Sequence, residues 1–385
     1  MRFADNRNKI GKYIPAVVFL IFIYGMALWF IFSPKPDYSS SEKRYLQKFP
    51  EVTAEKLLSG DFGSEFETFF ADRFPQRNTW VGLNAYTALA EGNNGASGVY
   101  NCKNGYLINK PVSTENNLDK NIGAVADFAK SIDTPTTVML VPSTGYIVDD
   151  VLPTFHDKYN DDEDISKISS TLSKDKIGFV DLRERFKSEY KNGSQLYYKT
   201  DHHWTTKGAY TGYQELCKAL GITPIDDSTL KKDSYPAFYG TTYSSSGFWL
   251  TPPDNIEIWN NPKNSDRNIS VKITEGANIK TSGSMYFTDH LKEDDKYPVF
   301  IDGNHALTEI TNTNAKNGTI LLIKDSFSHS LAPFLAENYS KVVLVDLRYY
   351  KESVSDLVTT YNPEQVVVLY GIDNLATDTD IVWLK

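Results

Sequence analysis

Two short segments of the chain carry the residue types that a nucleophilic enzyme needs. In the first, residues 199–205, Asp201 and His203 are one residue apart. In an extended backbone this spacing puts both side chains on one face, about 6–7 Å apart at Cα. A carboxylate at that range can fix the tautomer of an imidazole, as the acid of a Ser-His-Asp triad does. The spacing predicts an acid–base pair, although Asp201 could also be a turn residue and Trp204 a core aromatic.

The second segment, residues 323–329, follows an apolar run, opens a helical pattern and contains Ser326. A hydroxyl between a parallel strand and a helix lies in the crevice where α/β sheets bind ligands. Helix N–H groups there can also stabilise an oxyanion. The alternative is a plain N-cap, because Asp and Ser are common there. His329 is a rival base, but three residues along the same helix its ring would rarely turn back to the strand end.

Adjacent His202 and His203 could instead bind zinc. Neighbours on a strand point to opposite faces, so we expect the two rings not to converge on one metal. The sequence also has no HExxH motif and no cysteine near them. We therefore expect neither a metal nor another cofactor. Cys102 and Cys217 fit one optional disulfide or two unpaired thiols.

Apolar strands and amphipathic helices alternate from about residue 114 onward. The pattern predicts strands at 136–142, 177–182, 319–324, 341–347 and 365–370, and helices at 115–131, 205–220, 328–337 and 353–361. Continuous Val/Ile/Leu runs separated by helices indicate parallel strands buried on both faces. We predict a three-layer α/β/α domain over residues 114–385, with an irregular, β-rich insertion at about 222–315.

The chain opens with the pattern of a membrane anchor. Residues 14–32 form a run of 19 uncharged, mostly apolar residues, enough to span the ~30 Å hydrocarbon core as a helix. Residues 1–13 carry four basic side chains against one acidic one. This predicts a cytoplasmic tail and an extracytoplasmic bulk. A cleaved signal peptide is the alternative, although the run exceeds the usual ~7–15 residues and residues 32–35 are a poor cleavage site.

Residues 33–113 are then a linker and a helical, membrane-proximal lead-in. Apolar residues at helical spacing predict a helix over 51–73 that is interrupted near Gly60 and Gly63. The net charge of the whole chain is −9, and no Lys/Arg-rich stretch follows the N-terminus. We therefore expect lipid at residues 14–32 and no nucleic-acid partner.

The tetrapeptide at residues 201–204, Asp-His-His-Trp, is the one that names the DHHW family of extracytoplasmic proteins, and this chain resembles that family. The family is similar to the alginate O-acetyltransferase group, whose fold belongs to the SGNH-hydrolase superfamily. Weaker similarities lie at Glu67 with residues 72–77, and at 238–242, 324–327 and 345–350.

The resemblance implies roles for individual residues. Asp201 corresponds to the acid, His203 to the base and Ser326 to the nucleophile, with the Asp-His pair before the serine as in the alginate acetyltransferase branch. Gly240 and Asn374 are candidate oxyanion donors, and either could equally be a turn residue. The candidates for substrate binding are Tyr239, Tyr243, Trp249 and Arg348. The aromatic residues of 235–260, including Tyr235 and Trp259, could stack on sugars or simply pack the insertion.

These observations favour acyl transfer, with acetyl as the group, to a sugar hydroxyl of a cell-surface polysaccharide. The resemblance implies that a multi-span membrane acyltransferase supplies the acyl group. A carbohydrate acetylesterase with the same triad remains an alternative. So does a non-catalytic glycan-binding or scaffold protein of the cell envelope, in which Asp201 and Ser326 act as caps.

Overall fold

The computed structural model describes residues 12–112 and 117–384. The chain divides into two compact units, Met1–Tyr86 and Thr87–Lys385. The larger unit thus begins before residue 114, where we had placed its start. The reason is that β4 (Val99–Asn101) and β5 (Leu107–Asn109) bury Tyr100 and Ile108 in its core.

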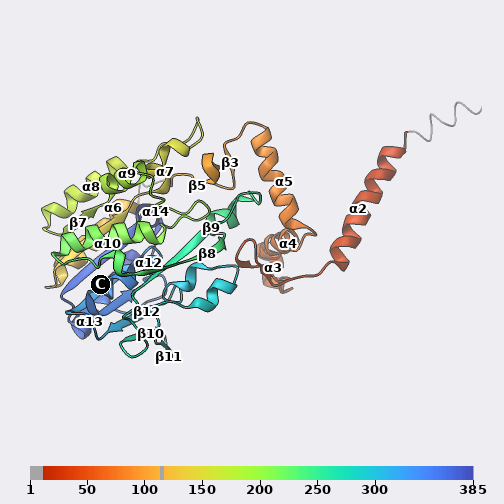
Figure 1. The fold of residues 1–385 in the computed structure, drawn as a ribbon. Helices are drawn as coiled ribbons and strands as arrows, with labels where there is room; N and C mark the ends of the chain where they lie inside the picture. Colours follow the sequence, from red (N-terminus) through yellow and green to blue (C-terminus); the bar gives the residue numbers. More distant parts are fainter. Residues whose placement is uncertain (1–11, 113–116, 385) are drawn as a thin grey trace, which may run out of the picture. The chain divides into compact units, whose positions relative to one another are not determined.

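Eight strands form the main sheet of the larger unit, in the order β11-β10-β12-β14-β13-β15-β6-β7. Figure 1 draws the fold, with β7, β10, β11 and β12 of this sheet labelled. In chain order they are β6 (Thr136–Val141), β7 (Gly178–Asp181), β10 (Ile269–Glu275), β11 (Asn278–Ser282), β12 (Leu307–Asn312), β13 (Asn317–Lys324), β14 (Tyr339–Val345) and β15 (Gln365–Gly371). The five strands from β14 to β7 pair in parallel, and β12, β10 and β11 are antiparallel. The predicted mixed α/β fold with a mostly parallel sheet is confirmed.

Helices cover both faces of this sheet, because successive side chains of each buried strand point to opposite sides. Val138 and Leu140 of β6 pack on one face, against α6 (Asn117–Ser131), α8 (Asp161–Lys174), α13 (Val354–Tyr361) and α14 (Ile372–Thr377). Met139 and Val141 pack on the other, against α9 (Arg183–Lys191), α10 (Thr206–Leu220) and α12 (Ser328–Leu335). All six residues of β6 are buried, as its continuously apolar sequence predicts.

The segment at about 222–315 is not an insertion separate from the sheet. Its strands β10, β11 and β12 extend the main sheet, with β12 paired to β14. Alternation of buried and exposed residues in β10 matches an antiparallel strand with one solvated face. Only β8 (Lys231–Phe238) and β9 (Asp254–Asn260) form a separate hairpin. Each of these strands mixes polar residues with apolar ones, so none forms the continuous apolar run that marks the parallel strands in the sequence.

The smaller unit contains α2 (Ile14–Phe32), α3 (Ala54–Ser59), α4 (Asp61–Asp72) and most of α5 (Arg77–Ala90). Within residues 12–112 and 117–384, α2 is the one helix long and apolar enough to cross a membrane. The predicted break near Gly60 is present, since Gly60 adopts φ 87° between α3 and α4, a conformation that favours glycine. Gly63 instead continues inside α4.

Candidate active site

Ser326 lies in the turn between β13, a central parallel strand, and α12. The buried carboxylate of Asp325 holds this turn. Its Oδ1 accepts the N–H of Phe327 at 2.9 Å. Its Oδ2 accepts the N–H of Gly371 and the side-chain amide of Asn374, both at 2.7 Å. Asp325 therefore ties the turn to the end of β15 and leaves the Ser326 hydroxyl half-buried.

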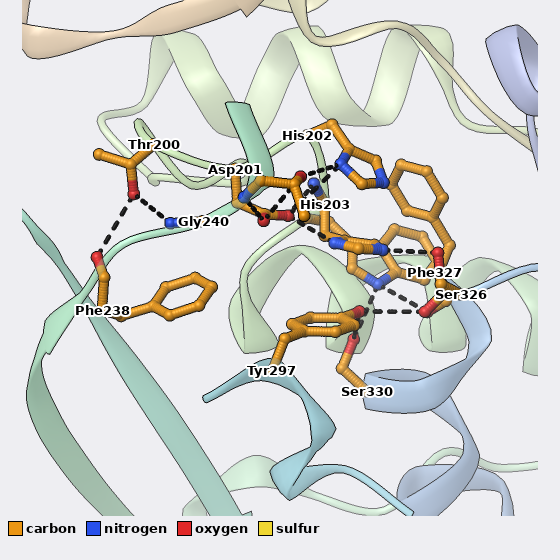
Figure 2. A network of polar contacts seen from close by, with 12 residues as sticks. Thr200, Asp201, His202, His203, Phe238, Gly240, Tyr297, Ser326, Phe327 and Ser330 are labelled. Carbon is orange, nitrogen blue, oxygen red and sulfur yellow. Dashed lines mark hydrogen bonds and ion pairs between the residues drawn. The ribbon is translucent and has the colours of Figure 1, made fainter. Parts of the chain in front are cut away.

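His203 joins Ser326 to Asp201 (Figure 2). Its Nε2 lies 2.7 Å from Ser326 Oγ, and its Nδ1 lies 2.5 Å from Asp201 Oδ1. Both Asp201 and His203 are buried. Asp201 Oδ1 also accepts the backbone N–H of His203 at 2.8 Å, so residues 201–203 bend around the carboxylate. The two separate segments thus meet in a Ser-His-Asp arrangement with hydrogen-bond contact at both links.

The second oxygen of Asp201 is held by Thr241 at the start of α11 (Thr241–Ser246). Asp201 Oδ2 accepts the Thr241 N–H at 2.7 Å and its hydroxyl at 3.1 Å. Burial disfavours the charged form of Asp201, but His203, His202 and these hydrogen bonds outweigh it and hold its pKa well below the usual range. Asp201 is therefore an ionised acceptor at neutral pH, as an acid that orients an imidazole must be.

Tyr297 contacts both His203 and Ser326. Its ring stacks on the His203 ring with centroids 3.9 Å apart and planes at 11°. Its hydroxyl donates to the backbone oxygen of Ser326 at 3.1 Å, as Figure 2 shows. Phe327 covers another side of the His203 ring at 5.2 Å. These contacts restrict the imidazole to the orientation that reaches Ser326.

His329 does not compete with His203 for the serine. Its Nε2 lies 2.8 Å from Lys324 Nζ, and Lys324 in turn pairs with Asp346 at 2.8 Å. Burial, followed by the charge of Lys324, holds the pKa of His329 well below its usual range. His329 is thus a neutral, buried member of an ionic cluster next to the Ser326 turn. Contrary to our argument from helix geometry, its ring does turn back to the strand end, but it bonds there to Lys324, the last residue of β13, and not to Ser326.

Arg348 belongs to the same cluster. Its Nε and Nη2 donate to the two oxygens of Asp346 at 2.9 and 2.6 Å, and Nη2 also reaches Asn304 at 2.9 Å. Asp346 itself is fully buried. Arg348 is therefore better explained as a support for Asp346 than as a ligand for sugar, the role that we expected.

The two expected oxyanion donors, Gly240 and Asn374, differ in whether they have an N–H that is not already used in a hydrogen bond. The Gly240 N–H donates to Thr200 Oγ1 at 3.2 Å (Figure 2), so it is not available to an oxyanion and that expectation is wrong. A Cβ at Gly240 would lie 2.1 Å from the Cβ of Asp201. Only a residue without a Cβ can therefore lie this close to Asp201. Asn374 uses one amide hydrogen on Asp325 and keeps a second, since a carboxamide has two.

The expectation that His202 and His203 point apart is also wrong. Residues 201–203 form a bend, and the two rings lie with centroids 3.9 Å apart. One ligand atom from each of Asp201, His202 and His203 falls within 4.8 Å of the others, so the three could approach one metal ion. However, Asp201 already bonds to His203 Nδ1, and His203 Nε2 already bonds to Ser326. His202 Nδ1 contacts Thr241 Oγ1 at 2.7 Å, and burial, then His203, lowers the pKa of His202 to about 4.

Three aromatic candidates form one cluster next to Thr241. The ring of Tyr243 lies 4.3 Å from Tyr239 and 5.1 Å from Trp249, and all three are half-buried. Tyr235 and Trp259 lie away from it on the β8–β9 hairpin, where Trp259 is buried. Both cysteines are buried free thiols, and burial raises the pKa of each to about 12.

Sequence reasoning missed three supporting residues. Thr241 lies in the stretch 238–242 that resembles the family, so it could have been noted. Asp325 could have been identified as a turn-forming side chain, because Asp often bonds the backbone two residues on. Nothing in the sequence singles out Tyr297, since its role depends on a contact with a histidine far away in the chain.

Fold and site together define an α/β protein with a Ser-His-Asp arrangement at the carboxyl edge of parallel strands. The family model for DHHW protein matches residues 105–345, more than half of the chain. The chain therefore belongs to the DHHW family, as predicted. No curated protein matches the sequence.

Solved structures share the fold at low sequence identity. A DHHW family protein from Eubacterium siraeum matches with a TM-score of 0.63 and 17% identity, over 75% of this chain and 95% of that chain. Bacillus cereus PatB1 matches with a TM-score of 0.62 and 21% identity, over 73% of this chain and 98% of that chain. PatB1 has also been solved with a sulfonyl adduct. The O-acetyltransferase domain of Pseudomonas putida AlgJ has a TM-score of 0.48 and 14% identity, over 75% and 95% of the two chains. At these identities the likeness establishes the fold alone.

Proposed function

We propose that the protein is a membrane-anchored, extracytoplasmic O-acyltransferase that modifies a cell-surface polysaccharide, with acetyl as the transferred group. The observation that carries the proposal is the pair of short contacts from His203, 2.7 Å to Ser326 Oγ and 2.5 Å to Asp201 Oδ1. Membership of the DHHW family supports it, and so does the resemblance of the chain to the SGNH-type alginate O-acetyltransferase group.

In the first half-reaction His203 Nε2 accepts the Ser326 proton while Ser326 Oγ attacks the acyl carbonyl carbon. The tetrahedral intermediate collapses when His203 returns that proton to the leaving oxygen of the donor, and Ser326 retains the acyl group as an ester. Asp201 keeps the His203 Nδ1–H in place and stabilises the imidazolium. We assign the second Asn374 amide hydrogen as one donor to the oxyanion.

In the second half-reaction a sugar hydroxyl takes the place of the leaving group. His203 removes its proton, the alkoxide oxygen attacks the Ser326 ester, and the proton returns to Ser326 Oγ as the acylated sugar departs. The cluster of Tyr239, Tyr243 and Trp249 supplies faces on which a sugar ring can stack. It is joined to the acid through the backbone, since the Tyr243 N–H donates to Thr200 at 2.9 Å.

The anchor would keep the site within reach of an acyl donor at the membrane. With α2 in the membrane and the N-terminus cytoplasmic, the domain that carries Ser326 is tethered to the membrane outside the cytoplasm. An acyl group brought across by a multi-span membrane acyltransferase would reach it there. A freely secreted esterase would need no such position.

The test is acetyl transfer from a chromogenic acetyl ester to an oligosaccharide by the purified full-length protein. Ser326→Ala and His203→Ala should each reduce turnover on the order of 10⁴- to 10⁶-fold. Ser328→Ala is the matched control, because its buried hydroxyl has no hydrogen-bond partner among the described residues. A sulfonyl fluoride should label Ser326 in the wild type and in Ser328→Ala.

The products separate the candidate functions. Acetylated oligosaccharide formed only with an active triad supports the transferase. Free acetate alone, at a rate that the acceptor does not change, identifies an acetylesterase. Equal turnover by wild type, Ser326→Ala and His203→Ala would identify a non-catalytic envelope protein.

A further inference from the structure

The smaller unit exposes an aromatic surface that the proposed reaction does not use. Phe62, Phe66, Phe69 and Phe70 follow i, i+4, i+7 and i+8 spacing on α4 and so share one face of the helix. Phe49 joins them, with its ring 5.4 Å from Phe69. We call these five residues the aromatic face. Phe49, Phe66 and Phe70 are 57%, 39% and 42% exposed.

The apolar helix α2 ends against this face. Phe30, in the last turn of α2, has its ring 4.7 Å from Phe70 and 6.2 Å from Phe69. At about 1.5 Å rise per residue, Phe30 lies only about 3 Å from the end of α2 at Phe32. If α2 spans a bilayer, the aromatic face lies at the depth where that helix leaves the hydrocarbon.

Asp72 and Arg73, both buried at the end of α4, hold the segment between α2 and α4 in this arrangement through hydrogen bonds and an ion pair. The guanidinium of Arg73 is buried and donates to the backbone oxygens of Gln47 and Leu46 at 3.1 and 3.3 Å. Asp72 accepts two bonds from Arg44, at 2.6 and 2.9 Å. The residues that follow α2 are thus fastened to the end of α4, so the contact of Phe30 with Phe70 is not that of a loose linker.

The opposite face of α4 is polar. Ser64 and Thr68 are exposed there, and the Thr68 hydroxyl donates to the Ser64 backbone oxygen at 3.0 Å. The exposed acidic residues Asp61 and Glu67 also lie away from the phenylalanines, so α4 is amphipathic, with an aromatic side and a polar, acidic side. Contiguous exposed apolar patches of this kind mark lipid or protein contacts.

We propose that the aromatic face lies in the interfacial layer of the outer leaflet, beside the exit of α2, and seats the smaller unit on the lipid. The inference rests on the anchor of the proposed function. Lipid is the occupant that the contacts favour, because the face is continuous with α2, none of whose residues is buried in the protein. A second lipid contact beside the anchor would fix the tilt of this unit on the membrane.

Single cysteines in the full-length protein, carrying an environment-sensitive fluorophore in phosphatidylcholine nanodiscs, test the proposal. The probes are Phe66→Cys and Phe70→Cys, and the matched controls on the polar face of the same helix are Ser64→Cys and Thr68→Cys. The native Cys102 and Cys217 are only 8% and 0% exposed, so they should stay unlabelled. Labels at 66 and 70 should emit at shorter wavelength, be quenched by nitroxide lipids and be protected from aqueous iodide. Labels at 64 and 68 should behave in the opposite way.

Equal iodide access at all four positions in nanodiscs would overturn the proposal. Protection of 66 and 70 in native membranes but not in nanodiscs would also overturn it and assign the face to a protein partner. If the cysteine variants fold poorly, Phe66→Trp and Thr68→Trp with brominated lipids give the same comparison. The readout is independent of catalysis, so Ser326→Ala protein should give the same result even if the proposed reaction fails.

Discussion

At the scale of single residues, Tyr297 orients His203, and Thr241 orients Asp201. Each contacts its partner directly and restricts its orientation, the first by ring stacking at 3.9 Å and the second by two hydrogen bonds to Oδ2. Asp201 and His203 are therefore positioned by neighbours from other parts of the chain as well as by each other. This is the preorganisation that a catalytic site needs.

Substituting Tyr297 separates its two contacts. Tyr297→Phe keeps the stacked ring and loses the bond to the Ser326 backbone, so it should cost about 1 kcal/mol of stability and leave kcat nearly unchanged. Tyr297→Leu removes the ring from His203 and should lower kcat by up to about 10²-fold, as expected for a misplaced catalytic group. Steady-state kinetics and thermal unfolding check both. Equal kcat for the two variants would show that stacking does not position the base.

Two carboxyl groups near the site, Asp161, which is buried, and Asp373, which is half-buried, predict a pH dependence of stability. Asp161 and Asp373 both bond to Ser143, at 2.7 and 3.1 Å. Burial raises the pKa of Asp161 to about 6. Burial, with the charge of Asp161, raises the pKa of Asp373 to about 7.

Between about pH 4 and pH 7 the folded protein keeps protons that the unfolded chain releases, so stability should fall as the pH rises through that range. Asp373→Asn should make the fall shallower, and thermal unfolding midpoints at pH 4.5 to 8 measure it. Asp127→Asn, at an exposed position on α6, is the control that should keep the wild-type slope. An unchanged slope in Asp373→Asn would contradict the assignment.

At the scale of elements, the turn into α11 and the turn into α12 approach each other at the carboxyl edge of the sheet. The first brings Gly240 against Asp201, and the second carries Ser326. Gly240 has φ −90°, which any residue can adopt. Glycine is therefore needed at position 240 because a Cβ would clash with Asp201, and not because of its backbone conformation.

Gly240→Ala should lower kcat by about 10²-fold or more, because its Cβ would displace Asp201 from His203. Gly123→Ala is the control, since a Cβ there meets nothing within 4 Å and α6 should gain about 1 kcal/mol from the better helix former. Rates and unfolding midpoints of both variants are compared. Full activity in a folded Gly240→Ala protein would show that the turn can yield without moving the acid.

At the scale of the whole molecule, the proposed reaction divides between the two units. The larger unit holds the Ser-His-Asp arrangement, and the smaller one holds the apolar helix. The chemistry at Ser326 should therefore be separable from the supply of acyl groups at the membrane.

Removal of residues 1–33 should leave sulfonyl labelling of Ser326 and hydrolysis of a soluble ester intact, but should abolish acetylation of the surface polymer in cells. Mass spectrometry of the labelled peptide and the acetyl content of the polymer measure the two effects. An unrelated single-pass helix in place of α2 should restore polymer acetylation. Full acetylation by a secreted, truncated protein would contradict the need for an anchor.

Local properties of the sequence were sufficient to predict many of the helices and strands. Apolar runs and their periodicity depend on neighbouring residues alone, so the span of α2 and the five parallel strands were predictable. The Asp201–His203 spacing and the strand–Ser326–helix order are likewise short-range. The same reasoning failed for His202, because it assumed an extended backbone where the chain bends, and for β10 to β12, whose partners lie elsewhere in the sheet.

Only the tertiary structure determines which side chains come into contact at the site. His203 and Ser326 are 123 residues apart in sequence, and only the sheet order, with β13 between β14 and β15, brings the Ser326 turn beneath the His203 ring. Thr241 opens the six-residue helix α11, and Tyr297 opens a 3-10 turn of three residues. Both elements are too short to give a periodic signal in the sequence. The sequence alone was enough to find the apolar span of residues 14–32, the buried strands and the candidate side chains of Asp201, His203 and Ser326. Their mutual distances, and with them the ionisation of Asp201, depend on long-range packing.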